Sequence, residues 1–276
     1  MKMKVDKIKK SLVECDIQSK FKILVSTTDD KFLERKNTPD SKYLIINQLI
    51  KKNKSQYNYD NMFIFKEKGL SRSRNSAIEL CDSEIVLISD DDVQFIENIE
   101  EIVAKAFMEN PDADIITFQV LTPDGKLFKN YSHHKYWHNI RTLMKVSSIE
   151  IAFKAKKIKN LGIKFDENFG LGSIFQTGEE FIFLTDALKK GLKILYLPIP
   201  IVIHPKESSG GRFNDENLIK AKGAMFYRVF GFWSYLISLL FAIKKHKLSD
   251  KSIFEFYKIM LNGIKEYKYL KNNNEI

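Results

Sequence analysis

The chain has 276 residues, of which 44% are hydrophobic and 29% are charged. This composition excludes a disordered or fibrous protein, and the length suits one large domain or one domain with an appendage. The only two cysteines, Cys15 and Cys81, provide neither a disulfide framework nor a metal-ligand cluster. They indicate a reducing compartment, and we expect a cytoplasmic protein.

The net charge of +10 lies at the two ends of the chain. Residues 1–10 carry five Lys and one Asp (+4), residues 206–276 carry thirteen Lys or Arg and seven Asp or Glu (+6), and residues 11–205 sum to zero. A neutral body with basic ends indicates an anionic partner, such as a membrane surface or a nucleic acid. A lysine bias of the source genome explains the same numbers. We expect no nucleic-acid partner, because basic residues are not interleaved with aromatic ones on a recognisable platform.

Apolar runs alternate with helical patterns over the first two hundred residues, which predicts an α/β fold. Strands are expected at residues 21–26, 43–47, 62–65, 85–88, 114–119 and 193–197. Helices are expected at residues 73–81, at 96–109 before Asn110-Pro111, and at 179–190 before Gly191.

A different pattern follows the polar loop at residues 206–212. Residues 229–243 are largely apolar and rich in aromatics, with Arg228 before them and three lysines among residues 244–247. Fifteen residues are fewer than the ~20 that a bilayer span needs. The pattern fits a helix lying in the lipid headgroup region, and it fits equally a buried helix that packs on the main domain.

Three consecutive carboxylates, Asp90-Asp91-Asp92, end the predicted strand at 85–88. Adjacent like charges are unfavourable unless a positive group lies among them, and ligands bind at strand ends in open α/β sheets. A hard divalent cation held by Asp90 and Asp92, itself binding a diphosphate, satisfies both conditions. The alternative is a solvated turn, because Asp is common in turns and caps.

A basic segment precedes these acids along the chain. Residues 66–75 read Lys-Glu-Lys-Gly-Leu-Ser-Arg-Ser-Arg-Asn, so that Gly69 permits a tight turn before a helix. The N–H groups of a helix start can hold an anion, and the guanidinium groups of Arg72 and Arg74 suit phosphate oxygens. Together with the acids, this segment predicts a site for a nucleotide diphosphate.

A third motif, Phe165-Asp166-Glu167-Asn168-Phe169-Gly170-Leu171-Gly172, is followed by Thr177-Gly178-Glu179-Glu180. Two acids at a helix start are common because they complement the helix dipole. Alternatively, a carboxylate that faces a sugar can accept the proton of an attacking hydroxyl group.

The order of these motifs over residues 21–205 resembles the inverting nucleotide-sugar glycosyltransferases of family two. Gly-Leu-Ser-Arg-Ser-Arg-Asn, Asp90-Asp91-Asp92, Phe-Asp-Glu-Asn-Phe-Gly-Leu-Gly, Gly-Glu-Glu and a strand reaching His204 carry the resemblance. The resemblance implies the GT-A fold, which is a Rossmann-like mixed α/β sheet flanked by helices. It is strongest to bacterial enzymes that build capsular or other surface polysaccharide.

The resemblance also implies a role for individual residues. Asp90 and Asp92 match the Asp-x-Asp pair that binds Mn²⁺ or Mg²⁺, Asp91 leaves the register of that pair ambiguous, and His204 matches a histidine of the metal or diphosphate site. Glu180 matches the catalytic base, with Glu in place of the usual Asp, and Glu179 takes this role if the register slips by one. The remaining residues are expected to bind the donor: Thr27, Lys68, Arg72, Arg74, Gly170 and Gly172.

The expected activity is metal-dependent, inverting transfer of a sugar from a nucleotide-diphosphate sugar, with UDP as the nucleotide by family habit. The acceptor is expected to be a saccharide or a polyprenyl-linked saccharide. The expected organisation is a basic extension at 1–20, the transferase domain at 21–205 and a basic helical appendage at 206–276 that binds the anionic inner face of the cell membrane. Two alternatives are an Asp-x-Asp phosphatase of the haloacid-dehalogenase type, in which Gln94 is atypical, and a non-catalytic membrane-associated scaffold. Tyr136, Trp137 and Glu150 are weaker candidates for acceptor contacts.

Overall fold

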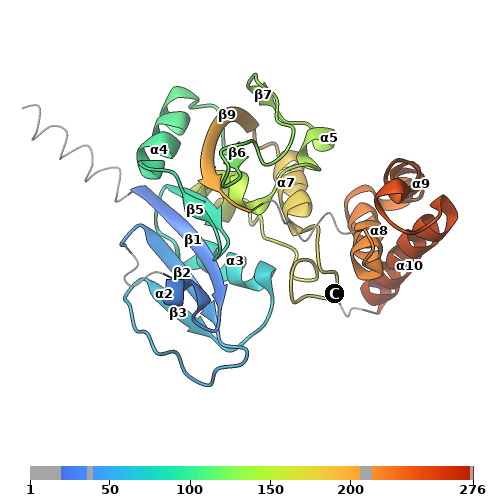
Figure 1. Cartoon of the computed structure of the whole chain (residues 1–276), viewed down its shortest axis with the longest axis horizontal. Helices are drawn as coiled ribbons and strands as arrows, with labels where there is room; N and C mark the ends of the chain where they lie inside the picture. Colours follow the sequence, from blue (N-terminus) through green and yellow to red (C-terminus); the bar gives the residue numbers. More distant parts are fainter. Residues whose placement is uncertain (1–19, 36–39, 206–212, 274–275) are drawn as a thin grey trace, which may run out of the picture. The chain divides into compact units, whose positions relative to one another are not determined.

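The computed structural model describes residues 20–35, 40–205, 213–273 and 276 (Figure 1). The predicted basic extension, apart from Lys20, and the loop at 206–212 lie outside the described residues. The chain forms two compact units. Within the described residues, the first unit contains residues 20–35, 40–67, 73–164 and 187–205, and the second contains residues 68–72, 165–186, 213–273 and 276.

A mixed sheet forms the centre of the first unit. Its strands within the described residues are β1 (Phe21–Thr28), β2 (Tyr43–Gln48), β3 (Met62–Phe65), β4 (Ile85–Ser89), β5 (Gln94–Phe95), β6 (Ile115–Leu121), β7 (Tyr136–Trp137), β8 (Ile151–Lys154) and β9 (Ile194–Ile203). The strand order is β3-β2-β1-β4-β8-β6-β9-β5, and β7 pairs with β9. Strands β3, β2, β1 and β4 run parallel, as do β6 and β9, whereas β8 is antiparallel to both β4 and β6. The predicted α/β class is confirmed.

Apolar side chains on both faces explain why the parallel strands read as continuous hydrophobic runs. All six residues of β2 are buried. Residues Phe21, Ile23 and Val25 of β1 share a core cluster with four residues of helix α4 (Ile99–Glu109). Helix α4 begins three residues later than predicted, and its last turn ends before Pro111, where the sequence placed the end of the helix.

The other helical elements of the first unit are short. They are α2 (Lys31–Arg35), α5 (Ile140–Leu143), η1 (Ser148–Glu150) and α6 (Ala155–Asn160). Helix α3 (Leu70–Leu80) begins in the second unit and continues in the first, and helix α7 (Glu179–Lys189) also crosses from the second unit to the first.

Strand β9 extends beyond the strand predicted at 193–197, which the sequence leads through Pro198 and Pro200 to His204. The strand continues through both prolines to Ile203. Its pairing with β6 shifts register on either side of Gln119, opposite Pro200, and such irregularities are where a strand tolerates proline.

The second unit is mostly helical. It contains α8 (Glu216–Phe230), η3 (Gly231–Trp233), α9 (Ser234–Lys245), η4 (His246–Leu248) and α10 (Ile253–Asn272). Helices α8 and α10 pack closely through Gly223 and Gly263, where an added Cβ would overlap backbone atoms of the facing helix.

The predicted helix at 229–243 is interrupted. Gly231 has a φ of 55°, a left-handed conformation that glycine adopts without steric cost, and this ends α8 before α9 begins. The stretch Glu216–Leu248 is long and apolar enough to cross a membrane by length and composition, a test that buried helices of soluble proteins also pass.

Candidate functional site

The acids Asp90, Asp91 and Asp92 follow β4 at the carboxyl end of the parallel strands, as predicted. Each has a different partner. An Asp90 oxygen is 2.9 Å from Nη2 of Arg74, an Asp92 oxygen is 3.4 Å from Nε2 of His204, and Asp91 accepts a 2.7 Å hydrogen bond from Thr27. These contacts involve six of the residues that the sequence singled out.

Thr27 and the turn after β1 give Asp91 a rigid support. The Thr27 hydroxyl group donates to Asp91 and accepts a 3.1 Å hydrogen bond from the N–H of Phe32. Asp29 and Asp30 follow with φ of 52° and 70°, which are left-handed conformations that non-glycine residues rarely adopt. Thr27 therefore acts on Asp91 directly, as a hydrogen-bond donor.

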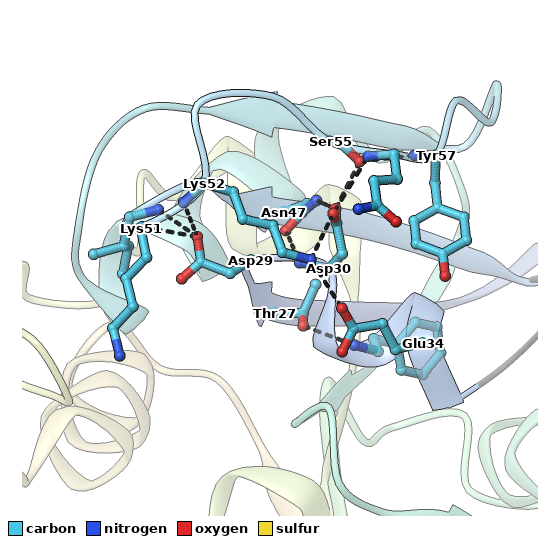
Figure 2. Close-up of polar contacts among 12 residues, drawn as sticks. Thr27, Asp29, Asp30, Glu34, Asn47, Lys51, Lys52, Ser55 and Tyr57 are labelled. Atoms are coloured by element: carbon cyan, nitrogen blue, oxygen red, sulfur yellow. Dashed lines mark hydrogen bonds and ion pairs between the residues drawn. The ribbon is translucent and has the colours of Figure 1, made fainter.

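Hydrogen bonds to the buried Asp30 hold this strained turn (Figure 2). Its carboxylate accepts from Asn47 and Ser55 at 2.6 Å each, and Lys52 lies 3.1 Å away. Asp29 accepts from three consecutive backbone N–H groups that begin at Ile50. The side chains that fix the end of β1 thus come from β2 and the loop that follows it.

The electrostatics of the three acids differ. Burial raises the pKa of Asp91, the hydrogen bond from Thr27 opposes this change, and the neighbouring charge of Asp92 adds to it. The hydrogen bond with His204 lowers the pKa of Asp92, and the same contact raises the pKa of His204. The contact between Asp92 and His204 therefore favours the ionised form of the carboxylate and the protonated form of the imidazole.

No group of three His, Cys, Asp or Glu side chains forms a ready-made metal site among the described residues. The donor set nevertheless fits a divalent cation, because carboxylate oxygens and an imidazole nitrogen are ligands that Mn²⁺ accepts. Two of these donors, an Asp92 oxygen and Nε2 of His204, already lie 3.4 Å apart. Arg74 forms an ion pair with Asp90 and is buried, with 1% of its surface exposed. In this arrangement its guanidinium group neutralises and orients the Asp90 carboxylate.

In the second unit, the start of α3 is joined to the glycine loop. The N–H of Leu70 donates to the carbonyl of Leu171, and the Ser71 hydroxyl group donates to the carbonyl of Phe169 at 2.6 Å. Gly170 and Gly172 have φ of 102° and 83°, so both positions favour glycine. The predicted helix start and the predicted glycine loop are thus held together by hydrogen bonds.

The two basic side chains beside this loop are accessible. Lys68 is exposed and its methylene groups lie along Gly172, while Arg72 pairs with Glu167 at 3.1 Å and is half exposed. An exposed ion pair of this kind contributes little to stability, so Arg72 can change partner at small cost.

The structure distinguishes the two candidate bases. Glu179 is buried, with 4% of its surface exposed, and lies against Gly170, where an added Cβ would be 3.1 Å from its carboxyl carbon. Glu180 is only partly buried. Glu180 is therefore the more accessible of the two residues.

Sequence reasoning missed two basic residues of α8 beside this segment. The ammonium group of Lys222 is 3.3 Å from the Thr177 hydroxyl group, and Arg228 binds both Asp166 and Asp186. The only signal in the sequence was that these cations interrupt an apolar helical pattern.

The weaker candidates differ in exposure. Trp137 is half exposed, whereas Tyr136 stacks on Tyr196 with ring centroids 4.7 Å apart. Glu150 is buried, pairs with Lys129 and accepts a 2.9 Å hydrogen bond from Tyr131. In this arrangement the Glu150 carboxylate is a structural anchor.

Comparison with known proteins identifies the family. The model of glycosyl transferase family 2 matches residues 38–179, which is slightly more than half of the chain. A search of curated proteins gave no match.

Solved structures show the same fold. A structure of S. aureus TarS residues 1–349 matches this chain with a TM-score of 0.51 and 14% identity, and the match covers 82% of this chain and 71% of the TarS chain. Another, in complex with UDP-GlcNAc, has a TM-score of 0.51 and 11% identity and covers 92% of each chain. At this identity the likeness to TarS concerns the fold. The family match and the shared GT-A fold show that this chain belongs to glycosyl transferase family 2 and is a glycosyltransferase.

Proposed function

We propose that this enzyme transfers a sugar, with inversion and with the help of Mn²⁺ or Mg²⁺, from a UDP-sugar to a saccharide or polyprenyl-linked saccharide. The observation that carries the proposal is the acidic triplet at the carboxyl end of β4, with Asp92 paired to His204. The family assignment removes the phosphatase alternative. UDP is the proposed nucleotide because TarS, which shares the fold, has been solved with UDP and with UDP-GlcNAc.

In this proposal Asp92, His204 and Asp90 hold the cation. When bound, the cation neutralises charge on the diphosphate as it leaves. Thr27 keeps Asp91 in place beside these ligands through its 2.7 Å hydrogen bond. Arg74 fixes the direction of the Asp90 carboxylate, because its guanidinium group is buried and lies 2.9 Å from an Asp90 oxygen.

Lys68, Arg72 and the backbone of the glycine loop are proposed to bind the donor. Lys68 and Arg72 are exposed cations at the start of α3, where the N–H groups of the first turn favour an anion. Gly170 and Gly172 leave the loop without side chains, so a sugar can approach its backbone.

Glu180 is proposed to be the base. Its carboxylate takes the proton of the acceptor hydroxyl group, the oxygen forms a bond to the anomeric carbon, and the bond from that carbon to the diphosphate breaks to release UDP. General base catalysis contributes about 10²–10⁴-fold. The exposure of Glu180 supports this choice over Glu179, which is buried against Gly170.

Calorimetric titration of UDP and GDP with and without Mn²⁺ tests the donor site. We expect UDP to bind only with metal, and binding to be lost in Asp92→Ala. The matched control is Asp82→Ala, because Asp82 is an exposed acid that precedes the opposite end of β4. Failure of both nucleotides to bind in the presence of metal would refute the proposed donor site.

We also propose that α9 binds the cytoplasmic face of the cell membrane. The distribution of its side chains is the reverse of that in a surface helix of a soluble protein, which turns its large apolar residues towards the core. Its buried face carries the small residues Ser234, Ser238 and Ala242, while Leu236, Leu240 and Ile243 are about half exposed. Phe232 and Trp233 at its start are 82% and 66% exposed.

The charge beside this apolar face fits an anionic lipid surface. Lys244 and Lys247, both exposed, follow the apolar residues, and aromatic residues with flanking lysines are typical of helices at the headgroup level. Co-sedimentation with phosphatidylglycerol vesicles and with phosphatidylcholine vesicles tests the proposal.

The informative variant carries Leu236→Asn together with Leu240→Asn. It should bind the anionic vesicles several-fold more weakly than the wild type. Met108→Asn is the control, because Met108 is a 76% exposed apolar residue on α4 of the first unit. Equal binding by all three proteins would refute the membrane proposal.

A further inference from the structure

A second hydroxyl group, besides that of Thr27, reaches the acidic triplet. Ser148 donates a 3.3 Å hydrogen bond to Oδ2 of Asp90. The other oxygen of this carboxylate, Oδ1, lies 2.9 Å from Nη2 of Arg74. A carboxylate has about four lone-pair sites. Each oxygen of Asp90 therefore has one protein donor, which fixes the plane of the carboxylate, and lone pairs remain for a cation.

The pairing of β8 with β4 explains why Ser148 lies beside Asp90. The two strands are antiparallel, with Leu87 opposite Ala152. In an antiparallel pair, the residues that precede one strand lie beside the residues that follow the other. The short helix η1 begins at Ser148 and leads directly into β8, so it lies next to the acids that follow β4.

The ammonium group of Lys129 holds the chain on both sides of Ser148. It lies 2.5 Å from Glu150, donates to Oγ of Ser147 at 3.1 Å and donates to the carbonyl group of Lys145. An ammonium group has three donors, so the three acceptors from this one stretch can use all of them. Ser148 thus lies between residues that a single cation holds in place.

Glu150 connects this stretch to the central sheet. Its carboxylate is buried and accepts a 2.9 Å hydrogen bond from Tyr131, whose hydroxyl group accepts from the N–H of Val120 on β6. Burial raises the pKa of Glu150, and the charge of Lys129 opposes this change. Removal of one partner from a buried ion pair leaves an uncompensated charge, so the pair resists separation. Helix η1 is therefore fixed to β6 as well as to the end of β4.

We propose that Ser148 is a positioning residue for the cation site, which holds the Asp90 carboxylate in the orientation that Mn²⁺ or Mg²⁺ requires. The inference rests on the proposed role of Asp90 as a metal ligand. Loss of a hydrogen-bond partner of a metal ligand typically lowers metal affinity by about 10–100-fold. Arg74 is one such partner of Asp90 and carries a charge. The Ser148 hydroxyl group orients the second oxygen without adding another positive charge beside the cation.

The test is the affinity for Mn²⁺ in the presence of saturating UDP, measured from the electron paramagnetic resonance signal of free Mn²⁺. In Ser148→Ala we expect the Kd for Mn²⁺ to rise by about 10-fold. Ser83→Ala is the matched control. Ser83 and Ser148 are both 5% exposed, and Ser83 precedes the opposite end of β4. The Kd of this control should equal that of the wild type.

A pair of variants with the same shape separates the hydroxyl group from packing, and it also decides the question if Ser148→Ala does not fold. Ser148→Thr keeps the hydroxyl group, whereas Ser148→Val has a methyl group in its place. We expect the Val variant to bind Mn²⁺ about 10-fold more weakly than the Thr variant. Equal affinities for Mn²⁺ within this pair, or the wild-type affinity in Ser148→Ala, overturn the inference. Failure of the wild type to bind Mn²⁺ with UDP would instead refute the proposed metal site.

Discussion

Gly263→Ala should destabilise the second unit, although alanine is the better helix former. Gly263 lies on α10 where it meets α8, and a Cβ would overlap the carbonyl oxygen of Lys220 and lie 2.8 Å from its carbonyl carbon. Non-bonded carbon atoms prefer about 3.5–4.0 Å, so the two helices would have to separate by about 1 Å. Backbone atoms of a helix cannot rotate away as a side chain can.

Two opposing free energies decide the outcome. Replacing glycine with alanine inside a helix favours folding by about 1 kcal/mol. Overpacking of a close-packed contact costs about 1–3 kcal/mol, and a clash with backbone belongs at the upper end of that range. We therefore expect a net loss of about 2 kcal/mol. For a chain of this size each kcal/mol lowers Tm by about 2–4 °C, which gives a decrease of about 4–8 °C.

Thermal unfolding followed by far-ultraviolet circular dichroism measures the change, and hydrogen exchange of α10 peptides assigns it to the second unit. Asn262→Ala is the control, because Asn262 is the exposed neighbour of Gly263 and this change gives only the gain in helix propensity. A Tm for Gly263→Ala that equals or exceeds that of Asn262→Ala would show that the close α8–α10 contact does not exist.

Three further substitutions test the supports of the site. Asp30→Asn should cost about 2 kcal/mol at pH 7 by chemical denaturation. Burial raises the pKa of Asp30 but its hydrogen bonds lower it below the usual value, so the wild-type advantage should be complete above about pH 4 and vanish as the pH falls further. Arg228→Met should cost about 3 kcal/mol, because two largely buried carboxylates lose their cation, and an unchanged urea midpoint would contradict this ion pairing. Gly178→Ala should cost about 1–3 kcal/mol of backbone strain, and adding Met225→Ala should recover the packing cost and leave the strain.

The predicted strands were confirmed because each is a short apolar run with buried side chains. The run Ile85–Ser89 is an example, since its hydrophobic residues end abruptly at the acids. Helix limits were less accurate, as at α3, which begins at Leu70 because its first turn is fixed by contacts with the glycine loop nearly a hundred residues later. Such contacts have no local signal. The prolines of β9 likewise lie in the strand at a position that no local signal reveals, because it is the irregular pairing with β6 that accepts Pro200.

The candidate site shows the same division between local motif and distant partner. The chemistry of a diphosphate and of a proton acceptor singled out Asp90, Asp92 and the Glu179-Glu180 pair as candidates. The resemblance to family two added His204 and assigned the base to Glu180. Nothing local to these motifs predicted that Arg74 would be buried against Asp90. The structure makes this arginine a partner of an acid, and any contact with a phosphate would have to compete with that ion pair.

The C-terminal appendage shows most clearly why the sequence alone could not predict which helical residues are buried and which are exposed. The pattern over residues 229–243 indicated either a membrane-facing helix or a buried one, and the structure divides these residues between the end of α8, η3 and α9. Helix α8 is buried and directs its cations to the loop and helix that carry the Glu-Glu pair, while α9 turns its large apolar residues outward. Gly231 makes the division possible, because its left-handed φ ends one helix and lets the next begin in a new direction. An enzyme organised in this way keeps the segment that carries its proposed base attached to the same helix that leads to the proposed membrane contact. Substitutions on the outer face of α9 should therefore weaken membrane binding, whereas Arg228→Met should lower stability.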